Sequence, residues 1–176
     1  ARIPYGTDER DIFVRAAYND SEVVFILEYE DSTKNVGGFV NPDAAAILFV
    51  KKNSPETKQM MGYGAKANIW HWLADRNFQK YKQGKKYINV VRELIAQGPG
   101  TQIEMTVQNV KGKGIYKNGK WKIVFKRELK SKYEDEFELG PGIPFEIAFA
   151  QWEGQKMESF SKKSISILRT LIWERK

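Results

Sequence analysis

Apolar and polar residues alternate with a period of two along much of this chain, and this alternation restricts its fold more than any other feature. Trp121, Ile123 and Phe125 would lie on one face of an extended chain. Their neighbours Lys122 and Lys126 would lie on the other face. A period of two is typical of half-buried β-strands, whereas helices repeat their apolar residues every three or four positions. The chain is therefore predicted to be rich in β-sheet.

At least seven segments carry this pattern, and turn residues separate them. The predicted strands cover residues 11–18, 22–30, 44–50, 102–108, 121–127, 144–152 and 164–173. The clearest turn is Asn118-Gly119, because both residues tolerate positive φ. Tyr116 and Trp121 flank this pair as the two strands of a hairpin would. The pattern predicts sheets of antiparallel strands.

A single domain over residues 1–176 is expected, since a chain of this length buries one full core more readily than two. The predicted fold is all-β: an antiparallel β-sandwich with long loops and one or two short helices. The longest loops lie around 53–66 and 75–87, and loops of that length are commonly functional. The best candidate for a helix is 88–96, which Gly98-Pro99-Gly100 would end.

Composition excludes several kinds of site. The chain has no cysteine, so it cannot hold disulfides, thiolate metal sites, iron–sulfur clusters or covalently attached c-type haem. No apolar run approaches the roughly 20 residues that cross a bilayer, so no membrane span is expected. The chain begins at Ala1 without an initiator methionine, which fits removal of an export signal and fits a shortened chain equally well.

Positive charge is concentrated in one part of the chain. The net charge is +7, and residues 111–132 hold nine Lys or Arg against the single acid Glu128. Residues 133–138 carry four acids. A basic surface of this kind can dock an acidic partner or nucleic acid. On charge alone, a solvated strand face is the preferred interpretation.

The single histidine, His71, lies between Trp70 and Trp72 in a predicted strand. One histidine cannot build a zinc site, and a histidine in this setting is more often a hydrogen-bonded packing residue than a ligand. No Ser-His-Asp or Cys-His arrangement and no phosphate-binding loop can be assigned. The residues therefore give little support to an enzyme.

Two other places hold residues that could bind a metal. Met60 and Met61 stand in a predicted loop, and a methionine thioether suits haem iron, although filling a gap in the core is the commoner role. Lys162 and Lys163 precede the last predicted strand, where paired lysines are ordinarily solvated. A lysine binds iron only when deprotonated, which requires enough desolvation to lower its pKa.

A series of short stretches, in a shared order, carries a family resemblance. They are Ala17-Tyr18-Asn19-Asp20, Glu28-Tyr29-Glu30-Asp31, Asp43-Ala44-Ala45 with Phe49, Met61-Gly62, Ile69-Trp70-His71-Trp72, Ala96-Gln97-Gly98-Pro99-Gly100-Thr101, Gly119-Lys120-Trp121, Phe125-Lys126-Arg127-Glu128-Leu129, Phe149-Ala150-Gln151-Trp152-Glu153-Gly154 and Lys163-Ser164. Together they resemble the haem b-binding subunit of ethylbenzene dehydrogenase and of its relatives in dimethyl sulfide dehydrogenase, chlorate reductase and selenate reductase.

The resemblance implies a β-sandwich enclosing one haem b, with a methionine and a lysine as axial ligands. By position these are Met61 and Lys163, with Tyr63, Trp70 and Trp72 walling the macrocycle. Alternation favours Lys163 over Lys162 if Ile165 and Ile167 face inward, whereas nothing but the resemblance favours Met61 over Met60. If neither lysine binds the iron, His71 is the leading candidate, and Lys156 and Met157 are further candidates nearby.

The resemblance also implies a non-catalytic electron-transfer subunit of an exported, periplasmic or otherwise extracytoplasmic, molybdopterin oxidoreductase. Its expected partners are a molybdopterin catalytic subunit, an iron–sulfur subunit and a soluble redox protein such as a cytochrome c, and not nucleic acid. Two rival interpretations are a cofactor-free carbohydrate-binding β-sandwich that stacks sugars on Trp121 or Trp152, and a nucleic-acid-binding sheet that uses residues 111–132. Both rivals predict a colourless protein, whereas the haem hypothesis predicts a red one.

Overall fold

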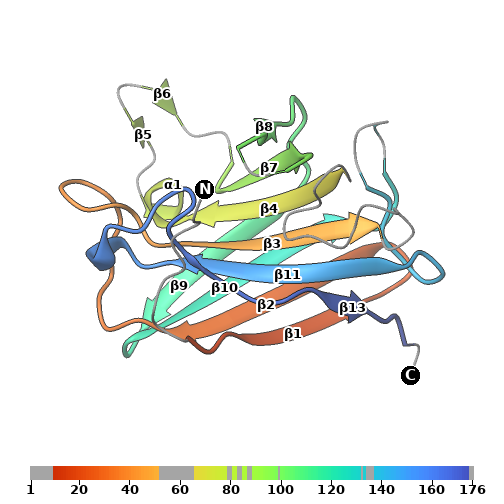
Figure 1. The fold of residues 1–176 in the computed structure, drawn as a ribbon, viewed down its shortest axis with the longest axis horizontal. Coiled ribbons are helices and arrows are strands. Elements are labelled where there is room, and N and C mark those ends of the chain that lie inside the picture. Colours follow the sequence, from red (N-terminus) through yellow and green to blue (C-terminus); the bar gives the residue numbers. More distant parts are fainter. Residues whose placement is uncertain are drawn as a thin grey trace.

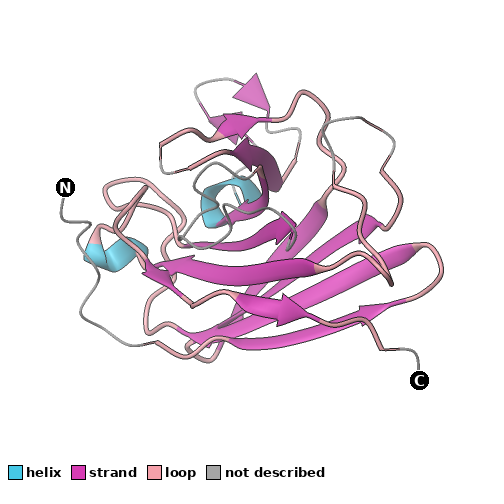
Figure 2. Cartoon of the chain, turned by 45° about the vertical axis from the view of Figure 1, so that its right-hand side comes forward, coloured by secondary structure: helices cyan, strands magenta, loops and turns pink. Residues whose placement is uncertain are grey.

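The structure is a computed structural model that describes residues 10–51, 66–78, 81–82, 85–86, 89–98, 100–131, 133 and 137–174. These residues form two antiparallel sheets, stacked as the layers of an open sandwich, and one small two-stranded sheet (Figures 1 and 2). The all-β prediction is confirmed. Among the described helices, none combines the length and apolarity that a membrane crossing demands.

The strands of the first sheet lie in the order β1 (Phe13–Tyr18), β2 (Glu22–Glu30), β10 (Lys120–Glu128) and β9 (Lys111–Lys117). The second sheet has the order β12 (Ser164–Ile165), β11 (Phe145–Trp152), β3 (Ala44–Lys51), β4 (Ala67–Leu73), β7 (Val91–Ala96) and β8 (Ile103–Glu104). Strand β13 (Arg169–Leu171) also pairs with β11. The remaining elements are α1 (Ala74–Phe78), the 3-10 helix η1 (Gly154–Lys156) and the paired strands β5 (Tyr81–Lys82) and β6 (Lys85–Lys86).

Large aromatic side chains fill the space between the two sheets. Every second residue of the central strands points into this core, as the alternation predicts. The largest fully buried side chains are Phe25, Phe49, Trp70, Trp72, Trp121, Phe125 and Phe145. Aromatic side chains of this size dominate the energetics of a core. The inner face of each sheet is therefore covered by the other sheet.

Two glycines let the edge strand β9 approach the second sheet. A Cβ atom at Gly114 would overlap the indole of Trp72, and one at Gly112 would overlap the side chain of Val91. The Gly112-Lys113-Gly114 stretch is thus explained by packing between the sheets.

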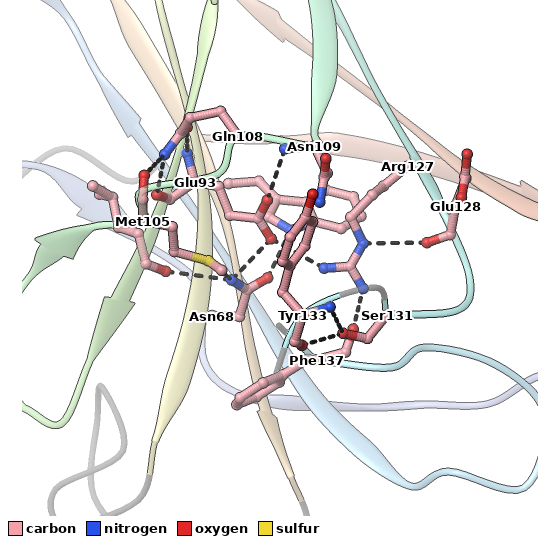
Figure 3. Close-up of polar contacts among 12 residues, drawn as sticks. Asn68, Glu93, Met105, Gln108, Asn109, Arg127, Glu128, Ser131, Tyr133 and Phe137 are labelled. Atoms are coloured by element: carbon pink, nitrogen blue, oxygen red, sulfur yellow. Dashed lines mark hydrogen bonds and ion pairs between the residues drawn. The ribbon is translucent and has the colours of Figure 1, made fainter. Parts of the chain in front are cut away.

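A buried polar network joins the sheets (Figure 3). Nη1 of Arg127 on β10 donates to Oε1 of Glu93 on β7 at 3.0 Å, and both side chains are at most 1% exposed. Asn68 donates to the same oxygen at 3.1 Å and accepts the indole N–H of Trp70 at 2.8 Å. Arg127 also donates to the carbonyl of Phe137. Because a charge left alone in this setting would be costly, the network favours one alignment of the two sheets.

Most predicted strands are confirmed, and the hairpin at Asn118-Gly119 has positive φ at both residues, 52° and 70°. The segment 102–108 is a strand only at β8. The segment 164–173 is divided into β12 and β13, since the hydroxyl of Ser166 accepts the N–H of Phe149 at 2.9 Å in place of a backbone carbonyl.

The predicted helix over 88–96 is wrong. Residues 91–96 form β7, which pairs with β4 from Val91 opposite Trp72 to Ala96 opposite Ala67. Val91 and Glu93 point into the core, so pairing and burial outweigh the weak helical signal of this segment.

Candidate functional site

The outer face of the second sheet, which points away from the first sheet, carries a second apolar cluster. Its buried members are Ala44, Ala46, Leu48, Val50, Ala67, Ile69, Leu94, Ala96, Ala148, Ala150 and Trp152. Leu73, Ile165 and Leu168 pack against them. Six of the eleven buried residues are alanines, so small side chains make up the middle of this face. We call this surface the alanine face.

The strand register places polar residues at one side of the alanine face. Ala150, Ala46 and His71 lie in one row across β11, β3 and β4. The row continues to Arg92 on β7 and, at its other end, to Ile165 on β12. His71 and Arg92 therefore lie on one side of the central alanines, and the segment that contains Lys163 lies on the other.

Lys163 is half-buried beside the alanine face. Its Nζ lies 5.4 Å from the ring centroid of Trp152 and donates to the carbonyl of Phe160 at 3.0 Å. Burial lowers the pKa of Lys163. Its amine is therefore easier to deprotonate than that of a lysine in water.

The neighbouring lysine points elsewhere. Lys162 is exposed, and its Nζ donates to the carbonyl of Lys156 at 2.7 Å. Ile165 packs on the cluster, whereas Ile167 is 66% exposed, so the alternation that favoured Lys163 holds for one of the two isoleucines. The choice of Lys163 over Lys162 as a ligand stays a prediction. Of the further candidates, Lys156 and Met157 are both exposed.

Asp43 forms hydrogen bonds that hold the turn after β11, which leads toward Lys163. Its Oδ1 accepts the N–H of Gly154 at 2.8 Å, while Oδ2 accepts the N–H of Asn35 at 2.7 Å and the indole N–H of Trp121 at 3.1 Å. Burial raises the pKa of Asp43 to about 6 against these three hydrogen bonds, which favour the carboxylate. The turn after β11 is thus tied directly to the core.

His71 contributes an enclosed nitrogen to the alanine face. Its ring centroid lies 5.0 Å from that of Trp152, and its Nε2 is buried without a hydrogen-bond partner among the described residues. Burial, and after it the positive charges of Arg92, Arg76 and Lys163, lower the pKa of this imidazole to about 3. The ring is therefore neutral at physiological pH, with one N–H to donate.

Trp70 and Trp72 are not brought together with Lys163. Both indoles are fully buried between the sheets, on the inner face of β4. The ring centroids of Trp70 and Phe49 lie 4.7 Å apart, and those of Trp72 and Trp121 lie 4.9 Å apart. The structure gives both tryptophans a packing role in the core.

Met60, Met61 and Tyr63 lie outside the described residues. In the sequence they connect β3 to β4, the two strands that contribute Ala44, Ala46 and Ala67 to the alanine face. Both members of the expected ligand pair, Met61 and Lys163, stay predictions.

The alanine face has features that fit a flat, apolar cofactor with an iron centre. Most of its central side chains are small, the amine of Lys163 lies at its border, and the enclosed Nε2 of His71 has no partner among the described residues. Within the described part of the chain, no group of three or more His, Cys, Asp or Glu side chains could hold a free metal ion.

The surfaces required by the two rival interpretations are less suitable. Trp121 is fully buried and Trp152 is 9% exposed, so neither indole offers a face on which a sugar could stack. On the basic hairpin, three lysines pair with glutamates of β2: Lys120 with Glu30 at 2.9 Å, Lys122 with Glu28 at 3.5 Å and Lys126 with Glu22 at 2.8 Å. These pairs neutralise part of the charge that nucleic acid would need.

The alanine face itself was not anticipated from the sequence, although a signal for it exists. Residues 44–50 read Ala-Ala-Ala-Ile-Leu-Phe-Val without a polar residue. A continuous apolar run of this length is typical of a strand that is buried on both faces.

Comparisons with known proteins agree with the resemblance noted in the sequence. The model of the ethylbenzene dehydrogenase family matches residues 97–164. The chain is 31% identical over 159 residues to a protein of Haloferax mediterranei named "Putative respiratory nitrate reductase heme subunit", covering 87% of this chain and 52% of that protein. It is 25% identical over 157 residues to the chlorate reductase subunit gamma of Ideonella dechloratans, covering 89% and 57%. The chain thus spans about half the length of the curated relatives it matches.

Among solved structures, a protein from Bacteroides uniformis described as a "putative carbohydrate-binding protein" aligns with a TM-score of 0.49 and 11% identity, over 96% of this chain and 73% of that one. A likeness this distant assigns no ligand.

Proposed function

From its confirmed resemblance to the ethylbenzene dehydrogenase family, we propose that this chain is a haem-binding, electron-transfer subunit of a larger oxidoreductase and not its catalytic subunit. The observation that carries the proposal is the position of Lys163. Its half-buried amine lies beside Trp152 at the border of an apolar surface built largely from alanines. An amine in such a place suits a ligand to a metal within an apolar cofactor.

We propose the alanine face, rather than the space between the sheets, as the haem site. Aromatic side chains already fill the space between the sheets, and a packed interior leaves few voids larger than a water molecule. The alanine face instead offers small side chains over four neighbouring strands. On this proposal, Trp70 and Trp72 support the sheet from its inner side and do not touch the macrocycle.

The cofactor we propose is haem b, with Lys163 and Met61 as axial ligands. It would supply a one-electron redox centre. An amine and a thioether are both neutral, so they favour the ferrous state more than a thiolate or phenolate would, and the reduction potential is expected to be high. If Lys163 and Met61 both held the iron, it would have no position open to a substrate, which would suit electron transfer.

The chain has no cysteine to ligate an iron–sulfur cluster through thiolates, so on this proposal it exchanges electrons with other subunits. We propose a molybdopterin catalytic subunit and an iron–sulfur subunit as partners, with a soluble redox protein such as a cytochrome c at the other end of the relay. Support comes from relatives named as subunits of a nitrate reductase and of chlorate reductase. An extracytoplasmic location forms part of the same proposal.

Haem reconstitution tests the proposal. The protein loaded with haem b should show a Soret band and a low-spin, six-coordinate spectrum. Lys163→Ala should convert this spectrum to a five-coordinate or water-ligated one, because the amine is lost. Lys162→Ala is the matched control and should leave the spectrum unchanged, since its side chain is exposed and bonds to Lys156. A loaded chain without a Soret band would overturn the proposed function.

The methionine ligand is tested in the same way. Met61→Ala should lose six-coordination, and Met60→Ala should keep it. A normal spectrum in both variants would remove the methionine proposal. A normal spectrum in Lys163→Ala would move the lysine assignment to Lys162, and insensitivity to both lysines would move it to His71.

A further inference from the structure

One corner of the alanine face is polar. His71 on β4 and Arg92 on β7 are direct partners in the strand register, so their side chains emerge next to each other on the same face. Leu94 and Ile69, the next pair on that face, are apolar members of the cluster. The corner therefore lies where the apolar residues of the alanine face meet charged side chains.

Each of the two side chains has hydrogen-bonding capacity that the described residues do not use. The buried Nε2 of His71 has no partner among them. Arg92 donates through Nε to Glu104 at 3.0 Å, and its side chain is about one-third exposed. The N–H groups at the other edge of the guanidinium point away from Glu104. Because enclosed polar groups in proteins nearly always have partners, an Nε2 without one among the described residues suits a group bound from outside the chain.

The chemistry of the corner favours an anion with planar oxygen acceptors. A neutral imidazole offers one N–H, and a guanidinium offers paired N–H groups that match a carboxylate. The positive charges of Arg92, Arg76 and Lys163 all act on His71, and Glu104 pairs with both arginines. On a porphyrin seated against the alanine face, the only anionic substituents are the two propionates.

We propose that the Nε2–H of His71 and the guanidinium of Arg92 bind the carboxylates of the porphyrin's propionate side chains. This inference rests on the proposed haem site and adds to it the residues that would set the orientation of the macrocycle. His71 acts as a positioning residue here, not as a ligand to iron.

The test compares haem b with its dimethyl ester, in which both carboxylates are capped and uncharged. His71→Phe keeps a ring of similar size against Trp152 and removes the N–H. This variant should release haem b about tenfold faster than the parent chain, as expected for loss of a hydrogen bond to a charged group. The parent chain and His71→Phe should release the dimethyl ester at the same rate. Both porphyrins should keep the six-coordinate spectrum.

Two further variants strengthen the comparison. His71→Gln retains an N–H donor and should restore much of the retention of haem b. Arg92→Gln alters a partly exposed side chain, and it should also weaken binding of haem b but not of the ester. If His71→Phe does not fold, Arg92→Gln still allows the comparison between haem b and its dimethyl ester.

Two outcomes would overturn the inference. Equal acceleration with haem b and with the ester would show that His71 only packs against the macrocycle. Loss of six-coordination in His71→Phe would make His71 an iron ligand instead. Failure of the proposed function would look different, because then neither protein would develop a Soret band with either porphyrin, and the inference would fall with it.

Discussion

The two faces of the second sheet are built from the same strands, yet their side chains differ in size and role. On β3, Ile47 and Phe49 point inward to an aromatic core, while Ala44, Ala46 and Leu48 point outward to the alanine face. The inner face is complete, because the first sheet covers it with large side chains. The outer face has small side chains at its centre, bordered by Lys163, Trp152 and the polar corner at His71.

This difference shows that burial alone does not tell how much a residue contributes to the free energy of folding. Residues on both faces are almost fully buried. Only the inner residues interlock with large partners from another sheet, so substitutions there should alter the free energy of unfolding. Substitutions on the alanine face should alter the binding of haem b more than they alter folding.

The largest effect is expected at the buried ion pair on the inner face. Glu93→Gln leaves Arg127 buried without its charged partner and should lower the free energy of unfolding by about 3–5 kcal/mol. Urea unfolding of the apoprotein measures this loss. Glu28→Gln is the matched control: Glu28 pairs with Arg15 and Lys122 at the surface, so its loss should cost at most about 1 kcal/mol. Similar losses in the two variants would contradict the central role given to the pair.

A smaller effect is expected from Asp43, which connects the core to the turn before Lys163. Its pKa is raised to about 6 in the folded protein, so folding favours the protonated carboxyl. The stability that this group contributes is complete below pH 4 and declines as the pH rises through about 6, by about 2–3 kcal/mol.

Asp43→Asn provides the control, because an amide does not titrate in this range. Urea unfolding of both proteins at pH 4, 5, 6 and 7 should show a loss of stability with rising pH in the parent chain relative to the variant. A difference that stays constant across this range would mean that the pKa of Asp43 is not raised.

The sharpest test of the two faces uses adjacent residues of β3. Ala45 points into the core and Ala46 lies on the alanine face. Ala45→Leu should lower the free energy of unfolding by about 1–3 kcal/mol through overpacking and change the affinity for haem b little. Ala46→Leu should weaken haem binding at least about tenfold, with a smaller loss of stability. If Ala46→Leu bound haem normally, the alanine face would not be the site.

The sequence predicts the strands well where one face is buried and the other is solvated. The alternation around Trp121 and the Asn118-Gly119 turn define β9 and β10, and both are confirmed. The segment that became β7 was missed because Glu93, a good helix former, is held in the core by Arg127. That partner lies 34 residues away, and no local pattern contains it.

The candidate site could be predicted only in part from the sequence. Alternation favours Lys163 over Lys162, and in the structure Lys163 is half-buried while Lys162 is exposed, but the ligand itself stays a prediction. The sequence placed Trp70 and Trp72 at the macrocycle and gave His71 a packing role, yet adjacent residues of a strand point to opposite faces and the two tryptophans lie in the core. The alanines of β3 and β11 become one surface only through the register between these strands.

The smallest effect is expected on the outer face of the first sheet, which carries solvent-exposed charged pairs instead of buried apolar side chains. There Lys120 and Glu30 form an exposed pair at 2.9 Å, with side chains 61% and 78% exposed. Lys120→Ala should change the free energy of unfolding by less than about 1 kcal/mol. It should also leave the release rate of haem b unaltered, measured by transfer to an excess of apomyoglobin. Faster release from Lys120→Ala would mean that the haem site extends beyond the second sheet, and the contrast between its two faces would lose its functional meaning.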